Sequence, residues 1–363
     1  MLEEILQQAM EQRASDVHLH IGSPPMLRLH GTLMVPPDFA VLTPDDLKNA
    51  AERILRPEQK ERFAAGEEID TSFSLPHVGR FRTNVFRQRG SLGIVFRRVN
   101  SEIPTVTDLN LPPAIASLTR FHAGLVLVTG VTGSGKSSTL ASIIDLLNEE
   151  RCAHIVTIED PIEYLYHNKR SIITQREIGQ DTLDFAHALK SVLRQDPDVI
   201  LIGEMRDAET IKAAITAAET GHLVLSTLHT TTAPQTIERI LEYFSEDMRP
   251  VLRQQLAFHL RAIISQRLVP RLDGQGMLPA VELLFMNPLV RKLVLESKMG
   301  LIKSIIHNAG NEGMQTFDQH LVALYNAGLV SYEEAQIASS NPDAFHMFCQ
   351  GFFSDIVQGI YDV

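Results

Sequence analysis

The sequence has 363 residues, of which 44% are hydrophobic and 21% charged, so the chain is long enough for two globular domains. Its net charge of −11 argues against general adhesion to nucleic acid or to an anionic membrane, because both need a basic face. The two cysteines, Cys152 and Cys349, are too few for a disulfide framework or a zinc site. No secretory signal fits and no apolar run is long enough to span a bilayer, which predicts a cytoplasmic protein without a membrane span.

The first 99 residues predict a small α+β domain. Apolar residues recur at helical spacing in 2–10, and they alternate with polar residues from Asp16 to Ile21 as in a half-buried strand. The further elements expected in this domain are short strands at 27–29 and 33–35, a helix near 45–55, and a hairpin around 80–99.

The proline-bearing segment 100–113 has no clear periodicity and is expected to be a linker. From 114 to 363 the pattern changes to continuous apolar strands that alternate with helical stretches, which is typical of a mainly parallel sheet. The expected strands are 125–129, 155–158, 199–202 and 223–225. From about Pro288 onward the pattern is helical and predicts no further strand.

A phosphate-binding loop is the strongest motif. Residues 130–137 read GVTGSGKS, which satisfies G-x-x-x-x-G-K-[ST], and they stand between a predicted strand and a predicted helix as that motif requires. Glycines let the backbone wrap closely around phosphate oxygens, Lys136 offsets the phosphate charge, and the Ser137 hydroxyl is a Mg²⁺ ligand. The residues expected to bind ATP here are Gly130, Thr132, Gly133, Ser134, Gly135, Lys136, Ser137 and Ser138.

Polar side chains follow three of the predicted strands. Glu204 ends the strand 199–202, and we expect it to act on Mg²⁺ and on the attacking water. Asp160 and Glu163 follow the strand 155–158 around Pro161; Glu163 could polarise the water, and Asp160 could orient the metal, although a solvated acidic loop fits this segment about equally well. His229, after the third strand, could sense the γ-phosphate.

Arginines are concentrated in the predicted hairpin. If Arg89 and Gly90 form the turn, Gln88 faces Ser91, and Arg82 lies opposite Arg97 on the face away from the phenylalanines. Directly opposed like charges cost stability, so the pair suggests an anionic partner. Nucleic acid, acidic side chains, and the triphosphate of a neighbouring subunit are the three candidates.

Four segments in this order resemble the boxes of the secretion ATPases: GVTGSGKS, TIEDPIE at 157–163, DPDVILIGEMRD at 196–207 and GHLVLSTLHT at 221–230. More narrowly, SDVHLHIGSPPMLRLHG at 15–31, GRFRTNVFRQR at 79–89 and GMQTFDQHL at 313–321 are similar to type IV pilus retraction ATPases of the PilT and PilU kind. The resemblance covers nearly the whole chain.

It implies an α/β protein in which a PAS-like α+β domain precedes a RecA-like ATPase domain with a helical C-terminal region. Such chains form a hexameric ring, hydrolyse ATP with Mg²⁺, couple to an inner-membrane platform protein, and remove pilin subunits during twitching motility. The resemblance further implies that Arg82 and Arg97 reach the phosphates, and that Arg194 and Arg239 lie near the nucleotide.

Two alternatives stay open. An accessory ring subunit that hydrolyses little ATP and docks on a paralogous motor would fit the unfamiliar segment 290–306, where the family has a basic Ile-Arg-Glu-Gly element, and the unfamiliar tail through Val363. Lys190 and Thr231 also depart from the usual arginine and asparagine. A nucleic-acid motor is supported by the arginine hairpin alone and is opposed by the acidic net charge, so nucleic acid is not an expected partner.

Overall fold

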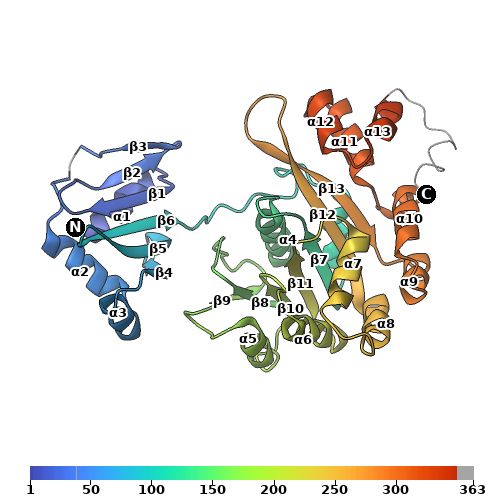
Figure 1. The fold of residues 1–363 in the computed structure, drawn as a ribbon, viewed down its shortest axis with the longest axis horizontal. Helices are drawn as coiled ribbons and strands as arrows, with labels where there is room; N and C mark the ends of the chain where they lie inside the picture. The colour runs from blue at the N-terminus through green and yellow to red at the C-terminus, as the bar shows by residue number, and fades with distance from the viewer. Residues whose placement is uncertain (38, 350–363) are drawn as a thin grey trace. The chain divides into compact units, whose positions relative to one another are not determined.

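The computed structural model describes residues 1–37 and 39–349, which form two compact units (Figure 1). The N-terminal unit comprises Met1–Glu102 and Pro161–Leu165; the C-terminal unit comprises Ile103–Asp160 and the chain from Tyr166 onward. The unfamiliar tail noted in the sequence lies outside the described residues from position 350.

The N-terminal unit is a six-stranded antiparallel sheet, in the order β3-β2-β1-β6-β5-β4, with three helices. Its elements are α1 (Leu2–Glu11), β1 (Asp16–His20), β2 (Met26–Leu29), β3 (Thr32–Met34), α2 (Pro44–Ile54), α3 (Pro57–Ala64), β4 (Ile69–Leu75), β5 (Gly79–Gln88) and β6 (Ser91–Arg98). The predicted elements are confirmed. Helix α3 and strand β4 are additions. Helix α3 buries only Gln59 and so has no clear hydrophobic period. In β4, Ile69, Phe73 and Leu75 alternate with polar residues, a strand pattern that was not among the predicted elements.

The hairpin of β5 and β6 has the predicted register. Gln88 pairs with Ser91, and Arg82 pairs with Arg97. Arg89 and Gly90 form the turn with φ of 48° and 78°, the positive values that a two-residue turn of this twist requires. Phe81 and Phe96 are buried, whereas both arginines are exposed.

The C-terminal unit is built on a seven-stranded sheet in the order β13-β12-β7-β11-β10-β8-β9, parallel except for the edge strand β13. Its strands are β7 (Gly124–Thr129), β8 (His154–Glu159), β9 (Ile172–Glu177), β10 (Val199–Ile202), β11 (Leu223–Leu228), β12 (Leu260–Pro270) and β13 (Met277–Phe285). Its α-helices are α4 (Lys136–Glu150), α5 (Phe185–Val192), α6 (Ala208–Glu219), α7 (Ala233–Glu242), α8 (Arg249–His259), α9 (Pro288–Leu295), α10 (Ile302–Asn308), α11 (Phe317–Asn326), α12 (Tyr332–Ala338) and α13 (Pro342–Cys349). Three short 3-10 helices are η1 (Pro113–Arg120), η2 (Met299–Leu301) and η3 (Gly310–Glu312).

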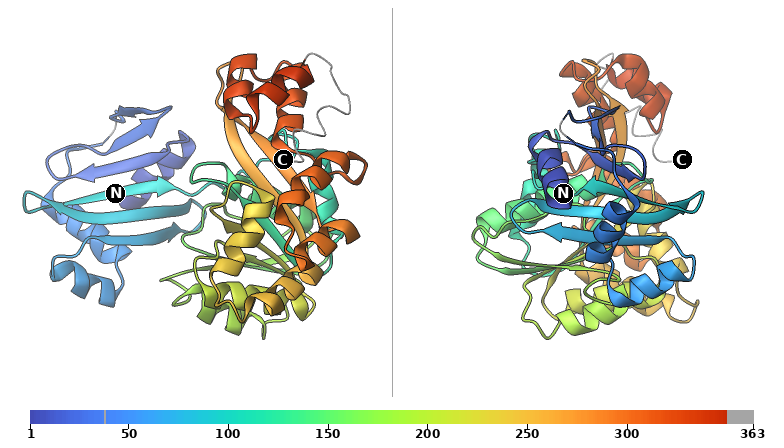
Figure 2. Two further views of the ribbon diagram at one scale, coloured as in Figure 1. Left: turned by 45° about the vertical axis from the view of Figure 1, so that its right-hand side comes forward. Right: turned by 90° about the vertical axis from the view of Figure 1, so that its left-hand side faces the viewer.

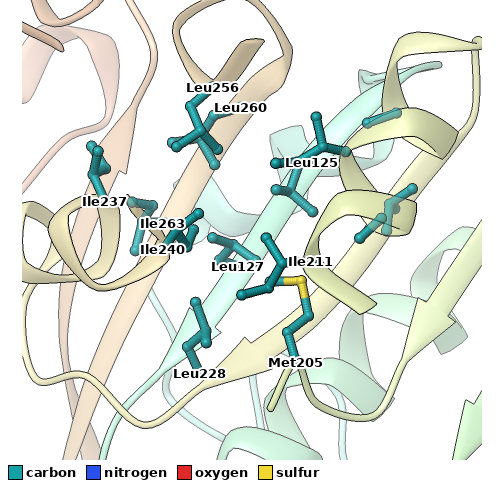
Figure 3. Close-up of a cluster of buried hydrophobic side chains, with 14 of the residues drawn as sticks. Leu125, Leu127, Met205, Ile211, Leu228, Ile237, Ile240, Leu256, Leu260 and Ile263 are labelled. Carbon is teal, nitrogen blue, oxygen red and sulfur yellow. The ribbon is translucent and has the colours of Figure 1, made fainter. Parts of the chain in front are cut away.

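Both faces of this sheet are covered, which explains the continuous apolar strands. In β7, Leu125 and Leu127 pack into a cluster with α5 to α10, as Figure 3 shows for part of it. Val126 and Val128 point to the other face and pack against α4 and η1. The next strand in the chain after the glycine loop is β8, which lies three places from β7 in the sheet. The chain order therefore reverses beside β7. Ligands of α/β proteins bind at such a point.

Strands β9, β12 and β13 were not among the predicted strands. In β12 the five consecutive residues 262–266 are all buried, and a short run buried on both faces has no period that separates a strand from a helix. The helical character predicted from Pro288 is confirmed, with no further named strand in 288–349. Helices α11, α12 and α13 pack on residues from one end of the β12–β13 hairpin (Figure 2). Among the described residues, no helix combines the length and apolarity needed to cross a bilayer.

Candidate active site

The phosphate loop connects β7 to α4 at the centre of the sheet, as predicted. Three glycines in it have φ between 79° and 148°, a region that other residues rarely adopt: Gly130, Gly133 and Gly135. A Cβ on Gly130 would lie 2.4 Å from both the backbone oxygen of Gln266 and the Oγ of Ser134, so no side chain fits there. The strain-free glycine backbone therefore closes the loop tightly against β12.

The loop carries the predicted binding groups in one short stretch. Thr132 and Gly133 are exposed, Ser134 is buried, and Ser137 and Ser138 are half-buried in the first turn of α4. The first N–H groups of a helix have no acceptor within it, and they attract anions. The start of α4 thus offers N–H groups suited to phosphate.

Lys136 is 9% exposed and folds back over the loop. Its Nζ donates to the backbone oxygens of Gly130 at 2.9 Å and of Val131 at 3.0 Å. These two carbonyls accept hydrogen bonds from the buried ammonium group, because a buried charge without a partner would be costly. A bound phosphate can take their place.

Charged side chains gather where neighbouring parallel strands end. Glu204 follows β10 and has a side chain 14% exposed, and its Oε2 lies 3.3 Å from Nε2 of His229, which follows β11. Arg206 forms an ion pair with Oε1 of Glu204, and its Nη1 lies 4.0 Å from Oδ2 of Asp160, after β8. The structure therefore brings three predicted residues, Glu204, His229 and Asp160, to one edge of the sheet.

Arg206 is the site residue that sequence reasoning missed. It is within the box 196–207, two positions after Glu204, and its charge was the available signal. The hydrogen bond to Glu204 raises the pKa of Arg206, so the guanidinium stays charged. It balances the carboxylates of Glu204 and Asp160 and holds them at the edge of the sheet.

Of the two consecutive acidic residues Glu159 and Asp160, Glu159, which ends β8, is the buried one. Glu159 is 8% exposed and accepts hydrogen bonds from Thr157 at 2.6 Å and from Gln175 at 3.2 Å. Its carboxylate is therefore occupied by side chains of β8 and β9. Asp160, one residue later, is the more exposed carboxylate that faces Arg206.

Three other predicted residues, Glu163, Arg194 and Arg239, are exposed. Glu163 belongs to the segment Pro161–Leu165, which groups with the N-terminal unit, where Tyr164 forms an isolated bridge with Asn100. Arg194 follows α5. Arg239 on α7 pairs with Glu242 at 3.0 Å and stacks over Tyr243 at 4.9 Å. Their roles toward the nucleotide stay predictions.

The two arginines of the hairpin differ in their surroundings. Nε of Arg97 donates to Oδ1 of Asp16 at 2.9 Å, and Arg28 approaches the same carboxylate at 3.7 Å. Burial raises the pKa of Asp16, but hydrogen bonds from Arg97 and Ser15 outweigh it and leave the pKa below its usual value. The side chain of Arg82 is exposed and makes no hydrogen bond or ion pair in the described part of the chain. One of the three anionic partners considered for the hairpin, an acidic side chain, is thus present for Arg97 within the same unit.

Together these features define a nucleoside-triphosphate site on a parallel sheet. Comparisons with known proteins agree: the model of the type II/IV secretion system protein family matches residues 97–333. The chain therefore belongs to this family, it is a secretion ATPase, and its α/β class with a RecA-like core is confirmed.

The similarity to individual members is extensive. The chain is 42% identical to the type IV pilus retraction ATPase PilT of Pseudomonas aeruginosa, covering 94% of this chain and 99% of PilT. It is 40% identical to the type IV pilus ATPase PilU of the same organism, covering 92% and 87%. A crystal structure of the pilus retraction motor PilT with bound ADP superposes with a TM-score of 0.84 at 46% identity, covering 94% of this chain and 97% of that one.

Proposed function

We propose that the chain is the ATP-hydrolysing subunit of a hexameric motor that powers type IV pilus retraction, and that it drives pilin removal and twitching motility. The observation that supports this most is the phosphate loop beside the Glu204, Arg206 and Asp160 edge, in a chain similar to PilT over nearly its full length. The proposal places ATP at the loop, with Arg194 and Arg239 as further nucleotide contacts.

The residues present are compatible with Mg²⁺. Within the described residues no group of three His, Cys, Asp or Glu side chains could hold a metal by itself. This suits Mg²⁺, which is usually bound through one or two protein groups together with substrate phosphates. Ser137, Glu204 and Asp160 would hold it directly or through its waters, and the ion would offset negative charge on the phosphates.

The chain's own groups would supply positioning and electrostatics. Lys136 and the N–H groups at the start of α4 hold the phosphates, Glu204 and Glu163 orient the attacking water, and His229 reports the γ-phosphate through its contact with Glu204. Arg82 and Arg97 would add positive charge at a neighbouring subunit's nucleotide. Arg97 would first have to exchange Asp16 for phosphate, whereas Arg82 has no such partner to leave.

The proposed partners are copies of the same chain in the ring, an inner-membrane platform protein of the pilus machine, and a paralogous retraction ATPase. The proposed location is the cytoplasm, peripheral to the inner membrane. Nucleic acid is not proposed as a partner, because the net charge is −11 and Asp16 already neutralises one of the two hairpin arginines.

ATP hydrolysis by the purified chain, measured with Mg²⁺ over a range of protein concentrations, tests the enzymatic part. We expect turnover to rise cooperatively with concentration and to fall by at least about a hundredfold in Glu204→Gln. Glu209→Gln is the matched control. Glu209 is an exposed residue of α6 that pairs with Lys190 of α5, so this variant should leave turnover unchanged. Full turnover in Glu204→Gln would contradict the assigned site.

An accessory ring subunit is the second candidate. It is favoured by nearly equal identity to PilU and PilT, 40% against 42%, and by the divergent segment 290–306. Negligible turnover by an assembled ring that binds ATP would support it. Deleting the gene in its own organism and following pilus retraction then tests the shared cellular role, and unchanged retraction would contradict both candidates.

A further inference from the structure

A buried glutamine outside the four ATPase boxes contacts the phosphate loop. Gln266 lies on β12 and is 1% exposed. Its Nε2 donates to the backbone oxygen of Ser134 at 2.6 Å, across 132 residues of sequence. The amide nitrogen must face that oxygen, because two acceptors would repel each other. The contact is therefore a defined hydrogen bond to the middle of the loop.

The position of Gln266 is fixed by the sheet. Ser265 pairs with Thr129, the last residue of β7, and their hydroxyl oxygens lie 2.8 Å apart in a buried contact. The next residue of β12, Gln266, consequently lies beside the loop that begins at Gly130. On its other side it pairs with Val281 of β13. Strands on both sides thus fix the backbone of β12 at the point where this side chain begins.

The contact determines which way a loop peptide faces. In a trans peptide the C=O and the next N–H point in opposite directions. Because the Ser134 oxygen points to Gln266, the N–H of Gly135 points away from β12 and joins the acceptor-free N–H groups at the start of α4. A glycine is also favoured at position 135, because a Cβ there would lie 3.1 Å from Nε2 of Gln266.

We infer that Gln266 is a positioning residue that holds the phosphate loop in its binding orientation through the Ser134 carbonyl. Lys136 also bonds loop carbonyls, but it has to release them to reach phosphate. The Gln266 bond points away from the phosphate side and can persist with and without nucleotide. The buried Oε1 of Gln266 has no hydrogen-bond partner in the described structure. Burying this oxygen costs free energy, which the hydrogen bond from Nε2 to Ser134 offsets.

This inference rests on the proposed nucleotide site, and ADP binding tests it. Gln266→Met keeps the side-chain volume and removes the donor, and Gln266→Asn keeps the amide but withdraws it by one methylene. Gln315→Met is the matched control, because Nε2 of Gln315 donates to the backbone oxygen of Val281 at 3.1 Å, away from the loop. We expect both Gln266 variants to bind ADP roughly three- to tenfold more weakly than the wild type, and the control to stay within about twofold.

A purely structural role would lower the melting temperature without this selectivity. The positioning role instead predicts a raised KM for ATP with a smaller change in kcat, since binding of the phosphates is weakened in both ground and transition states. Wild-type ADP affinity in either folded Gln266 variant overturns the inference, and so does equal weakening in Gln315→Met. A wild-type chain that binds no ADP would contradict the proposed nucleotide site instead.

Discussion

Two groups of ionisable side chains in the C-terminal unit show opposite solutions to the burial of charge. At the carboxyl edge of the sheet, Glu204, Arg206 and Asp160 neutralise one another, and the arginine is largely exposed. Around β13 and α11, the side chains of Glu282 and His320 are buried and each accepts a backbone N–H, from Ala233 at 2.8 Å and from Val281 at 2.9 Å.

The difference between the two groups indicates which charged residues serve catalysis and which serve the stability of the fold. A charge held by another mobile charge can exchange its partner for a phosphate or an ion at little cost. A polar group bonded to a backbone N–H in the core cannot move without leaving that donor unsatisfied. The first group is therefore expected to control turnover, and the second to control stability and its pH dependence.

The largest expected effect is at the phosphate loop. Lys136→Ala should reduce ATP turnover on the order of a thousandfold, because the charge that offsets the phosphates is lost. The melting temperature should change little, since the loop carbonyls that it bonds can reach water in the variant. Lys190→Ala, which removes an exposed lysine paired with Glu209, is the control and should hydrolyse normally. Turnover that survives in Lys136→Ala would show that the nucleotide site is elsewhere.

The next effect is the acid sensitivity of His320. Burial lowers the pKa of His320 from 6.5 to about 4, so the unfolded chain binds its proton more readily than the folded one. The stability it contributes is present above pH 6.5 and is lost as the pH falls toward 4, by about 2 kcal/mol between pH 7 and pH 5. In urea denaturation, His320→Asn should lose less stability over this interval than the wild type. An equal loss in both proteins would contradict the assignment.

Glu282 should behave with the opposite sign. Burial raises the pKa of Glu282 from 4.5 to about 6, so its contribution to stability is present below pH 4.5 and is lost as the pH rises through 6. Glu282→Gln, which still accepts the Ala233 N–H, should be more stable than the wild type at pH 7 by up to about 2 kcal/mol. The gain should shrink toward pH 5. A variant that is less stable than the wild type at pH 7 would show that the ionised carboxylate is needed.

The smallest effect lies in the N-terminal unit, where the Arg97 and Asp16 pair combines a buried carboxylate with an exposed arginine. Arg97→Ala should lower the free energy of unfolding by about 1 kcal/mol, because Asp16 loses its nearest cationic donor. Arg82→Ala should stay within about 0.5 kcal/mol. Under the proposed function both variants lower turnover and leave nucleotide binding largely intact. Equal stability of the two variants would contradict the structural role of Arg97, and normal turnover in both would contradict their role at the phosphates.

Much of the fold was readable from local pattern. The spacing around Arg89 and Gly90 predicts the hairpin register that places Arg82 opposite Arg97, because a two-residue turn fixes every later pair. The apolar runs predict the buried parallel strands that carry Glu204 and the phosphate loop. Strands β12 and β13 were missed because a run buried on both faces has no alternation, and α8 passes into β12 without a turn residue.

The sequence by itself determined the motifs whose parts are close in the chain: the glycine loop with Lys136, and the acidic residues after two of the strands. Only the tertiary structure decided which distant groups complete them. Gln266 reaches Ser134 across 132 residues, and Arg97 reaches Asp16 across 81. The physical reason is that periodicity and turn chemistry act over a few residues, whereas these contacts depend on strand order in the sheet, which no local pattern encodes.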